Sequence, residues 1–212
     1  MMQPEFPLIL ASGSPRRREL LEQIGISFEI CPAKGEEIMN SILPWEVVSE
    51  LSAQKAGEVA GMLNQYGESH KELITPQDIM VIGADTVVAA GNEILGKPKD
   101  EADAKRMLKK LAGNSHDVYT GVTLVFLSSS GRAGEHTFYE KTSVTMREMS
   151  DTEIDRYIAT GEPMDKAGAY AIQGKCAIYI DKIEGDYNNV VGLPVSAIYR
   201  ELKKLGIDWY LW

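Results

Sequence analysis

The sequence predicts an α/β fold built around a mixed β-sheet. Apolar, strand-like segments alternate with amphipathic helical segments in the first half of the chain, as is typical of α/β proteins. Two long strand-like segments, 116–127 and 136–146, then follow each other without a helix between them. This pair would not belong to a pure βαβ array, so we expect a mixed central sheet flanked by helices. The 212 residues suffice for one core, and we expect a single domain over residues 1–212.

Turn and capping residues delimit the elements of the first half. The apolar run 7–12 ends at Gly13, and a helix begins after Ser14 with Pro15 in its first position and ends at Gly25. We then expect a strand at 27–31, a helix from Pro44 to about Leu63 with the apolar stripe Val48, Leu51, Val59, Met62 and Leu63, a polar surface loop at 64–78, and a buried strand at 79–90.

Equally clear signals delimit the second half. Gly91-Asn92 predicts a hairpin turn, Asp100 caps a helix, and Ser150 with Glu153 forms a capping box. We expect a strand at 93–95, a helix from 100 to about 113, the two long strands joined by the Ser-Gly stretch 128–134, a helix at 150–161, strands at 169–172 and 177–183, and a last helix from Pro194 to Gly206.

The composition is that of a globular protein with an acidic surface. Lys and Arg total 22, Asp and Glu total 31, and the formal net charge is -9. This charge opposes binding to duplex DNA but leaves room for a local basic pocket that binds a small phosphorylated ligand. The cysteines form no CxxC pair, the histidines lack zinc-ligand spacing, the first residues lack a signal-peptide pattern, and no apolar run reaches the ~20 residues of a bilayer span. We therefore expect a cytoplasmic protein that binds neither nucleic acid nor membranes.

The first candidate site lies where the first strand meets the first helix. Residues 12–15 (Ser-Gly-Ser-Pro) place free backbone N–H groups at a helix N-terminus, an arrangement that binds anions. Arg16, Arg17 and Arg18 follow in the first turn, where the helix dipole disfavours positive charge. A bound phosphate would offset that cost, because Arg makes bidentate contacts with phosphate. The alternative is an ordinary Ser-Pro helix start with solvated arginines, and the pattern leaves both open.

A carboxylate interrupts the apolar strand at Asp85. It is costly to bury unpaired, so it must meet a metal, a cation or solvent. The preceding Gly83-Ala84 leaves room for a ligand close to the backbone, which favours a functional role. The alternative is a structural Asp bonded to backbone amides at a bulge.

Two lysines and a glycine-rich segment complete the candidates. Lys55 lies between Leu51 and Val59 on the apolar stripe of its helix, so it either snorkels to solvent or faces a cleft. Lys97 follows the expected hairpin and has no significance alone. Residues 165–174 combine an Asp-Lys pair with small residues that permit close backbone approach, or they are simply a loop entering a strand.

Taken together, these segments resemble the Maf family of nucleoside triphosphate pyrophosphatases. The matching stretches are LILASGSPRRRELL, GADTVV, LGKPKDEADAKRMLKKLAG, DKAGAYAIQG and VVGLPV, in that order. The resemblance covers about residues 8 to 205 and is weakest in the 64–78 segment. It implies a Maf/ITPase-like fold, with two lobes around a deep cleft, and a homodimer.

The resemblance also implies an activity, the hydrolysis of a nucleoside triphosphate to its monophosphate and pyrophosphate. The family proton acceptor matches Asp85, which would take a proton from a water in line with the α-phosphorus. Glu37 matches an acidic metal or water ligand, and Asp85 and Glu37 would share a divalent cation, Mg²⁺ or Mn²⁺. The positions that bind phosphate match Ser12, Arg16, Arg17, Lys55 and Lys97.

Three positions separate a pyrimidine-selective branch of the family from a methylated-guanosine branch. Arg17, Thr86 and Gln173 all match the branch that acts on dTTP and UTP, normal or modified. We expect Gln173 to contact the base, because its amide offers a donor and an acceptor to the O4/N3–H edge shared by thymine and uracil. Thr86 is the nearest residue in sequence that could hold this amide, and backbone groups around Gly174 could also hold it.

Two other functions compete with this expectation. The family name is associated with blocked septum formation, so the chain could be a nucleotide-binding regulator of cell division without essential catalysis. An intact Asp85 disfavours that alternative, because a pure binder gains nothing from a base beside a scissile phosphate. A nucleic-acid-binding protein is disfavoured by the net charge and by an aromatic content of only 8%.

Overall fold

A mixed sheet forms the centre of the fold in the computed structural model, which describes residues 7–69, 78–128, 131–207 and 209. In these ranges the sheet has seven strands in the order β2-β1-β3-β5-β6-β7, and β4 also pairs with β3. The first strand, β1, is parallel to β2 and β3, and the remaining pairs are antiparallel. The strands are β1 Leu8–Leu10, β2 Phe28–Ile30, β3 Ile79–Ala90, β4 Glu93–Leu95, β5 Ser115–Ser128, β6 Gly131–Met146 and β7 Ile180–Glu184.

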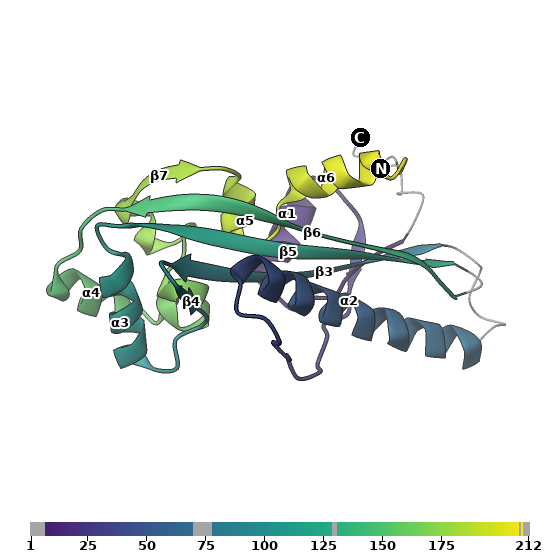
Figure 1. The fold of residues 1–212 in the computed structure, drawn as a ribbon, viewed down its shortest axis with the longest axis horizontal. Helices are drawn as coiled ribbons and strands as arrows, with labels where there is room; N and C mark the ends of the chain where they lie inside the picture. Colours follow the sequence, from purple (N-terminus) through teal and green to yellow (C-terminus); the bar gives the residue numbers. More distant parts are fainter. Residues whose placement is uncertain (1–6, 70–77, 129–130, 208, 210–212) are drawn as a thin grey trace.

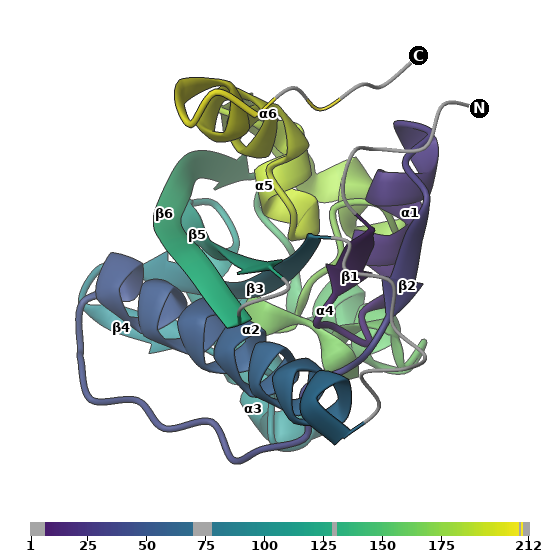
Figure 2. The ribbon, with the colours of Figure 1, turned by 90° about the vertical axis from the view of Figure 1, so that its right-hand side faces the viewer.

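Helices cover both faces of this sheet, so the expected α/β architecture is confirmed. The helix α2 lies along one face of β3 and β5, whereas α1, α5 and α6 lie on the other side (Figures 1 and 2). The α-helices are α1 Pro15–Gln23, α2 Pro44–Ser69, α3 Glu101–Leu111, α4 Asp151–Ile158, α5 Tyr187–Val191 and α6 Val195–Lys204, with 3-10 turns at Glu162–Asp165, Ala167–Ala169 and Lys175–Tyr179. In the described ranges, no helix combines the length and apolar character of a membrane span.

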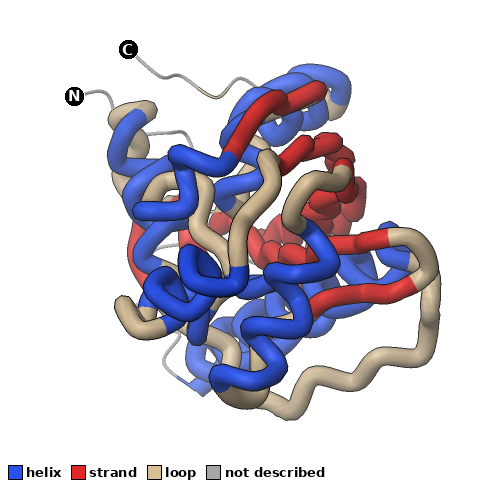
Figure 3. Tube along the Cα trace, turned by 90° about the vertical axis from the view of Figure 1, so that its left-hand side faces the viewer, coloured by secondary structure: helices blue, strands red, loops and turns tan. Residues whose placement is uncertain are grey.

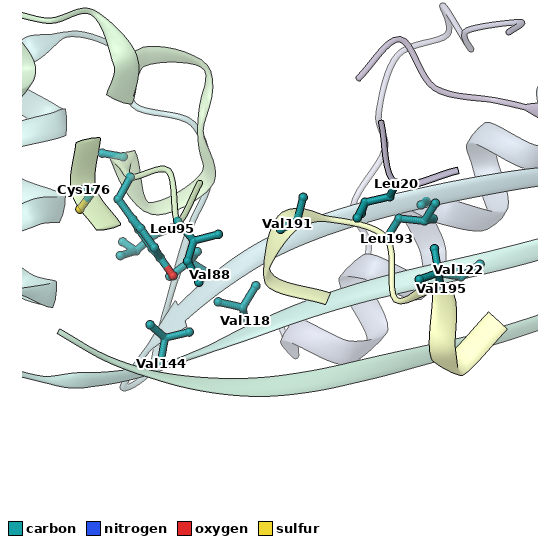
Figure 4. Packing of buried hydrophobic residues seen from close by; sticks show 14 of the residues in the cluster. Leu20, Val88, Leu95, Val118, Val122, Val144, Cys176, Val191, Leu193 and Val195 are labelled. Atoms are coloured by element: carbon teal, nitrogen blue, oxygen red, sulfur yellow. The ribbon is translucent and has the colours of Figure 1, made fainter. Parts of the chain in front are cut away.

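The long strands β3, β5 and β6 run along the long axis of the molecule (Figure 1). One cluster of buried side chains runs along them and includes Val88, Leu95, Leu20 and Leu193 (Figure 4). Successive residues of β3 alternate between the two faces, so that Ile82 joins this main core whereas Val81 packs in a separate cluster beneath α2. The sheet therefore separates the main core from the apolar side chains beneath α2.

Two glycines bring the α2 backbone against the sheet. A Cβ atom on Gly83 would lie 2.4 Å from the carbonyl oxygen of Ser52, and one on Gly121 would lie 2.2 Å from that of Val48. No side chain fits at either position. Our expectation that Gly83 leaves room for a ligand is therefore wrong, because α2 fills that space. The close contact instead sets how far Lys55, on the same helix, stands from the strand.

One edge of β3 is interrupted in its middle. The segment from Met80 to Ile82 pairs with β1, and the segment from Val88 to Ala90 pairs with β4. Between them, residues 83–87 have no strand partner on that edge within the described chain, while the other edge pairs with β5 throughout. The gap opens the sheet edge at Asp85, where two half-buried residues interrupt the buried run of β3.

Several further expectations are wrong, including the connection at 131–134, which is the beginning of β6, and the strand at 177–179, which is a 3-10 turn. Helix α2 continues through residues 64–69 where we expected a loop, because an established helix extends readily into polar residues; residues 70–77 lie outside the described ranges. Met62, expected on the apolar stripe, is 42% exposed. Residues 169–172 do not form a strand, because Gly168 and Ala169 adopt φ values of 69° and 60° and turn the chain.

The buried His116 makes stability depend on pH. Its side chain is 3% exposed and its Nε2 atom lies 2.9 Å from the hydroxyl of Tyr170. Burial lowers the pKa of His116 from 6.5 to about 4, so the unfolded chain binds more protons than the folded chain between these values. Stability is therefore expected to fall by about 3 kcal/mol as the pH drops from 6.5 to 4.

Urea unfolding at several pH values measures this effect. The double variant His116→Phe/Tyr170→Phe removes both polar partners and keeps their ring shapes, so its folding should stay close to that of the native chain. We expect its stability to vary much less over the same pH range. An unchanged pH slope in the double variant would assign the effect to other groups.

Candidate active site

A cleft of about 320 Å³ opens at the gap in the β3 edge. Its walls come from α1, the loop between β2 and α2, α2, β3, the residues after β4, the 165–173 segment and α5. The predicted residues among its lining are Arg16, Arg17, Glu37, Lys55, Asp85, Thr86, Lys97 and Gln173. Residues distant in sequence therefore meet at one place, in a cleft at the open edge of β3.

Lys55 is the centre of a charged cluster inside the cleft. Its ammonium contacts the Asp85 carboxylate and lies 2.9 Å from Oε1 of Glu37. The side chains of Lys55 and Asp85 are only 17% and 13% exposed, so Lys55 faces the cleft and does not snorkel to solvent. The pairing of β3 with β5 is regular at Asp85, which excludes the alternative of a structural Asp at a bulge.

The charge of Glu37 is stabilised by the same lysine. Its hydrogen bond with Lys55 lowers the pKa of Glu37, and the nearby charges of Lys97 and Arg17 add to this effect against the opposing influence of burial. Glu37 is therefore ionised at neutral pH. Two carboxylates, Glu37 and Asp85, thus converge on the single point that the Lys55 ammonium occupies.

This convergence fits a magnesium-type ion. Mg²⁺ is commonly held by one or two carboxylates and takes its other ligands from substrate phosphates and water. Glu37 and Asp85 supply the two carboxylates. The described residues contain no group of three or more His, Cys, Asp or Glu side chains placed to hold a metal. The donor set therefore suits a metal that arrives with a phosphorylated ligand.

Arg17 is fixed on the face of β3 that carries Thr86, opposite the face that carries Asp85. Its Nε donates to the carbonyl oxygen of Gly192 at 2.8 Å, its Nη1 to Oγ of Ser12 at 3.0 Å, and its Nη2 to Oγ1 of Thr86 at 3.2 Å. Burial lowers the pKa of Arg17, and the charge of Asp85 opposes that shift. Ser12 lies behind Arg17, where its hydroxyl also accepts from the backbone N–H of Ser14 at 3.3 Å.

Arg16 reaches across the cleft to the 165–173 segment. Its Nη1 lies 3.3 Å from Oδ2 of Asp165, and Asp165 also pairs with Lys166. Burial opposes the ionisation of Asp165, but its contacts with Lys166 and Arg16 keep its pKa below the ordinary value. The third arginine, Arg18, is exposed and pairs with Glu22 at 3.5 Å. Each arginine of the first turn therefore faces a negative partner or an acceptor.

Lys97 and Gln173 remain available to a ligand. Both line the cleft, both are exposed, and neither forms a hydrogen bond or ion pair with another described residue. Thr86 does not hold the Gln173 amide as we expected, because its hydroxyl bonds with Arg17 and Thr120 on the opposite side of β3 from Asp85. The Gln173 side chain has no hydrogen-bond partner among the described residues.

A row of side chains on α2 holds the loop that contains Glu37. Glu50, Gln54 and Glu58 are spaced four residues apart and accept hydrogen bonds from the backbone N–H groups of Asn40, Ile38, Lys34 and Gly35 at 2.8 to 3.0 Å. The loop runs as an extended segment around the outside of α2 (Figures 2 and 3). Sequence analysis did not identify this row, although its four-residue spacing beside the apolar stripe could be read from the sequence.

Removing one member of this row should loosen the loop. Glu58→Ala leaves the N–H groups of Lys34 and Gly35 without their carboxylate acceptor, whose hydrogen bonds keep the pKa of Glu58 low. Because both amides lose their acceptor, hydrogen exchange at Lys34 and Gly35 should accelerate, by about tenfold for the loss of one hydrogen bond. Glu46→Ala, at an exposed position of the same helix, is the control. Equal exchange rates in both variants would show that Glu58 does not hold the loop.

Known proteins resemble this chain in sequence and in fold. A dTTP/UTP pyrophosphatase from Agathobacter rectalis is 65% identical over 201 residues, covering 95% of this chain and 98% of that protein. A dTTP/UTP pyrophosphatase from Lachnoclostridium phytofermentans is 48% identical over 203 residues, covering 96% and 97%. The solved structure of a HAM1 protein from Coxiella burnetii has a similar fold, with a TM-score of 0.51 at 14% identity over 94% of this chain and 99% of that chain. Residues 7–205 match the model of the Maf-like protein family, and the chain belongs to the Maf family.

Proposed function

We propose that this chain hydrolyses dTTP and UTP, including modified forms, to the nucleoside monophosphate and pyrophosphate. The observation that supports this most directly is Asp85, a carboxylate at the open edge of β3 with Lys55, Arg17 and Lys97 in the same cleft. A triphosphate needs several cations around it, and a hydrolase needs a base beside them. Family membership and the names of the two relatives support the same activity.

In the proposed reaction, Asp85 accepts the proton of a water that attacks the α-phosphorus. A bond forms between the water oxygen and the α-phosphorus, and the bond to the bridging α,β-oxygen breaks. Pyrophosphate leaves with the electron pair of that bond, and the monophosphate keeps the water oxygen. Phosphoryl transfer of this kind depends mainly on positioning and electrostatics.

The cleft cations would stabilise the negative charge that develops on the leaving pyrophosphate. Arg16, Arg17, Lys55 and Lys97 are assigned to the phosphates, with Ser12 holding Arg17 and the helix N-terminus behind it. Lys55 and Arg16 would exchange their carboxylate partners for phosphate oxygens as the substrate enters. A divalent cation, Mg²⁺ or Mn²⁺, would be held by Glu37 and Asp85 and would supply Lewis-acid polarisation of water and phosphoryl oxygens.

Gln173 is assigned to the pyrimidine base. Its side chain is exposed in the cleft, and its amide can pair with the O4/N3–H edge of thymine or uracil. A site that hydrogen-bonds its substrate rejects analogues with the wrong groups more strongly than an apolar pocket does. We therefore expect dTTP and UTP to be far better substrates than CTP, ATP or GTP.

A panel of nucleoside triphosphates tests this function. Each is incubated with Mg²⁺, and monophosphate and pyrophosphate are measured separately. Gln173→Ala should narrow the difference between UTP and CTP and leave the metal requirement unchanged. Lys175→Ala, an exposed neighbour outside the cleft lining, is the control. If Gln173→Ala lowers the rates for all nucleotides by one factor, Gln173 supports its segment and does not contact the base.

We also propose a location and an oligomeric state for the enzyme. It would act in the cytoplasm as a homodimer of one two-lobed domain, without nucleic acid or membrane partners. The net charge of -9 supports the exclusion of nucleic acid. Light scattering after size exclusion measures the oligomeric state, and a monomeric mass of 23.4 kDa would contradict the dimer.

A further inference from the structure

A chain of hydroxyl groups leads from Arg17 to the interior of the protein. The Oγ1 atom of Thr86 accepts from Nη2 of Arg17 at 3.2 Å and lies 2.9 Å from Oγ1 of Thr120. The Thr120 hydroxyl donates to the carbonyl oxygen of Asn189 at 2.9 Å. Thr120 is on β5, is fully buried and does not line the cleft.

Counting protons fixes the direction of every bond in this chain. A threonine hydroxyl has one hydrogen, and a carbonyl oxygen can only accept. Thr120 gives its hydrogen to Asn189, so in the bond between the two threonines Thr86 is the donor. Thr86 therefore has no hydrogen left for a substrate, and its oxygen serves Arg17 as an acceptor.

The Asn189 end of this series of hydrogen bonds is rigid. Asn189 is fully buried on α5, and its Nδ2 donates to the carbonyl oxygen of Val118 and to Oγ1 of Thr142, both at 3.0 Å. Its backbone carbonyl is thus held in place on the sheet. The orientation of the Thr86 hydroxyl depends on this anchor through Thr120.

The contacts of Arg17 leave it suited to a bidentate ligand. A guanidinium has five N–H groups, and three of them are used by Ser12, Thr86 and Gly192. Within the described chain, one N–H therefore remains on each terminal nitrogen. These two N–H groups are available to phosphate oxygens.

We propose that Thr120 is a positioning residue for Arg17, acting through Thr86. This inference rests on the proposed function, because it assigns Thr120 to the phosphate-binding step of the same site. Without the Thr120 hydroxyl, the hydrogen of Thr86 loses its acceptor, and Thr86 is free to turn away from Arg17. The influence of Thr86 on substrate choice is then exerted through the placement of Arg17 and not through a hydrogen bond donated to the base.

The chain contains a matched control for Thr120. Thr123 is on the same strand and is equally buried, but its hydroxyl lies 2.9 Å from those of Ser52 and Thr137, on the α2 side of the sheet. Thr120→Val and Thr123→Val each replace one buried hydroxyl by a methyl group of the same shape. Any general effect of losing a buried hydroxyl should appear in both variants.

The first measurement is solvent exchange of the Arg17 Nη2–H, the group that donates to Thr86, by NMR in the protein without ligand. Thr120→Val should accelerate this exchange roughly tenfold, the usual effect of losing one hydrogen bond, whereas Thr123→Val and Thr120→Ser should leave it close to the native rate. This readout does not require activity, so it tests the inference even if the proposed hydrolysis fails. Equal exchange in Thr120→Val and Thr123→Val would overturn the inference.

The second measurement is a double-variant cycle on UTP hydrolysis and on pyrophosphate affinity. Thr120→Val should lower kcat/KM for UTP and weaken pyrophosphate binding roughly tenfold, and Thr120→Ser should restore both. In the Arg17→Ala background, Thr120→Val should have no further effect. An undiminished effect in that background would overturn the inference while leaving the proposed function intact.

Discussion

Asp85→Asn is expected to give a folded protein that binds UTP but hydrolyses it at least about a hundredfold more slowly. The amide is nearly isosteric with the carboxylate but cannot accept the proton of the attacking water, and general bases contribute about 10²–10⁴-fold. The fold should persist, because Lys55 keeps its ion pair with Glu37. Single-turnover hydrolysis and UTP binding by calorimetry separate chemistry from affinity.

The control for this prediction is Asp117→Asn. Asp117 is also an aspartate paired with a lysine, at 2.8 Å from Lys141, but it lies on β5 outside the cleft lining. The Asp117→Asn substitution removes the same charge from a similar ion pair, and the turnover of this variant should remain near that of the native protein. If Asp85→Asn kept more than about a hundredth of native turnover, Asp85 would not be the general base.

Gly121→Ala is expected to destabilise the fold by about 3 kcal/mol or more. The added Cβ would lie 2.2 Å from the Val48 carbonyl oxygen and 2.8 Å from the Ser49 nitrogen, and these backbone atoms cannot turn aside as a side chain could. Overpacking of a core typically costs about 1–3 kcal/mol, and a backbone obstacle lies at the upper end of that range or beyond. Urea unfolding gives the free-energy difference directly.

Gly61→Ala, on α2, should have the opposite effect on stability. A Cβ at Gly61 meets nothing within 4 Å, and replacing a helical glycine by alanine stabilises by about 0.5–1 kcal/mol. Gly121→Ala should also reduce turnover in the fraction that remains folded, because lifting α2 moves Lys55 away from Asp85. A Gly121→Ala protein of native stability would mean that α2 does not rest on the sheet at this point.

Local signals predicted most of the fold. The capping box of Ser150 with Glu153 and the Asp100 cap both form as expected, and β3 begins and ends at the predicted residues. Each of these features depends on residues a few positions apart. The turn at Gly168-Ala169 could not be predicted, because a buried alanine at positive φ follows from its surroundings and not from its type. The short helix α5 was missed for a similar reason, since its five residues have no helical periodicity of their own.

For the candidate site, too, local features could be predicted from the sequence and long-range contacts could not. Residues in unusual local settings, such as Asp85 within an apolar strand and Lys55 on an apolar stripe, could be identified from sequence alone. Their partners could not, because the contact of Arg16 with Asp165 spans 149 positions and exists only in the folded chain. Gly83 was misassigned because sequence shows that a glycine permits close approach but not which element approaches.

Hydrolysis of UTP in ¹⁸O-labelled water tests the central claim, that this cleft directs water at the α-phosphorus. The products are separated and the position of the label is determined by mass spectrometry. We predict one labelled oxygen in UMP and unlabelled pyrophosphate, a pattern that should accompany whatever slow turnover remains in Asp85→Asn. Label in pyrophosphate with unlabelled UMP, or UDP and inorganic phosphate as products, would contradict the account.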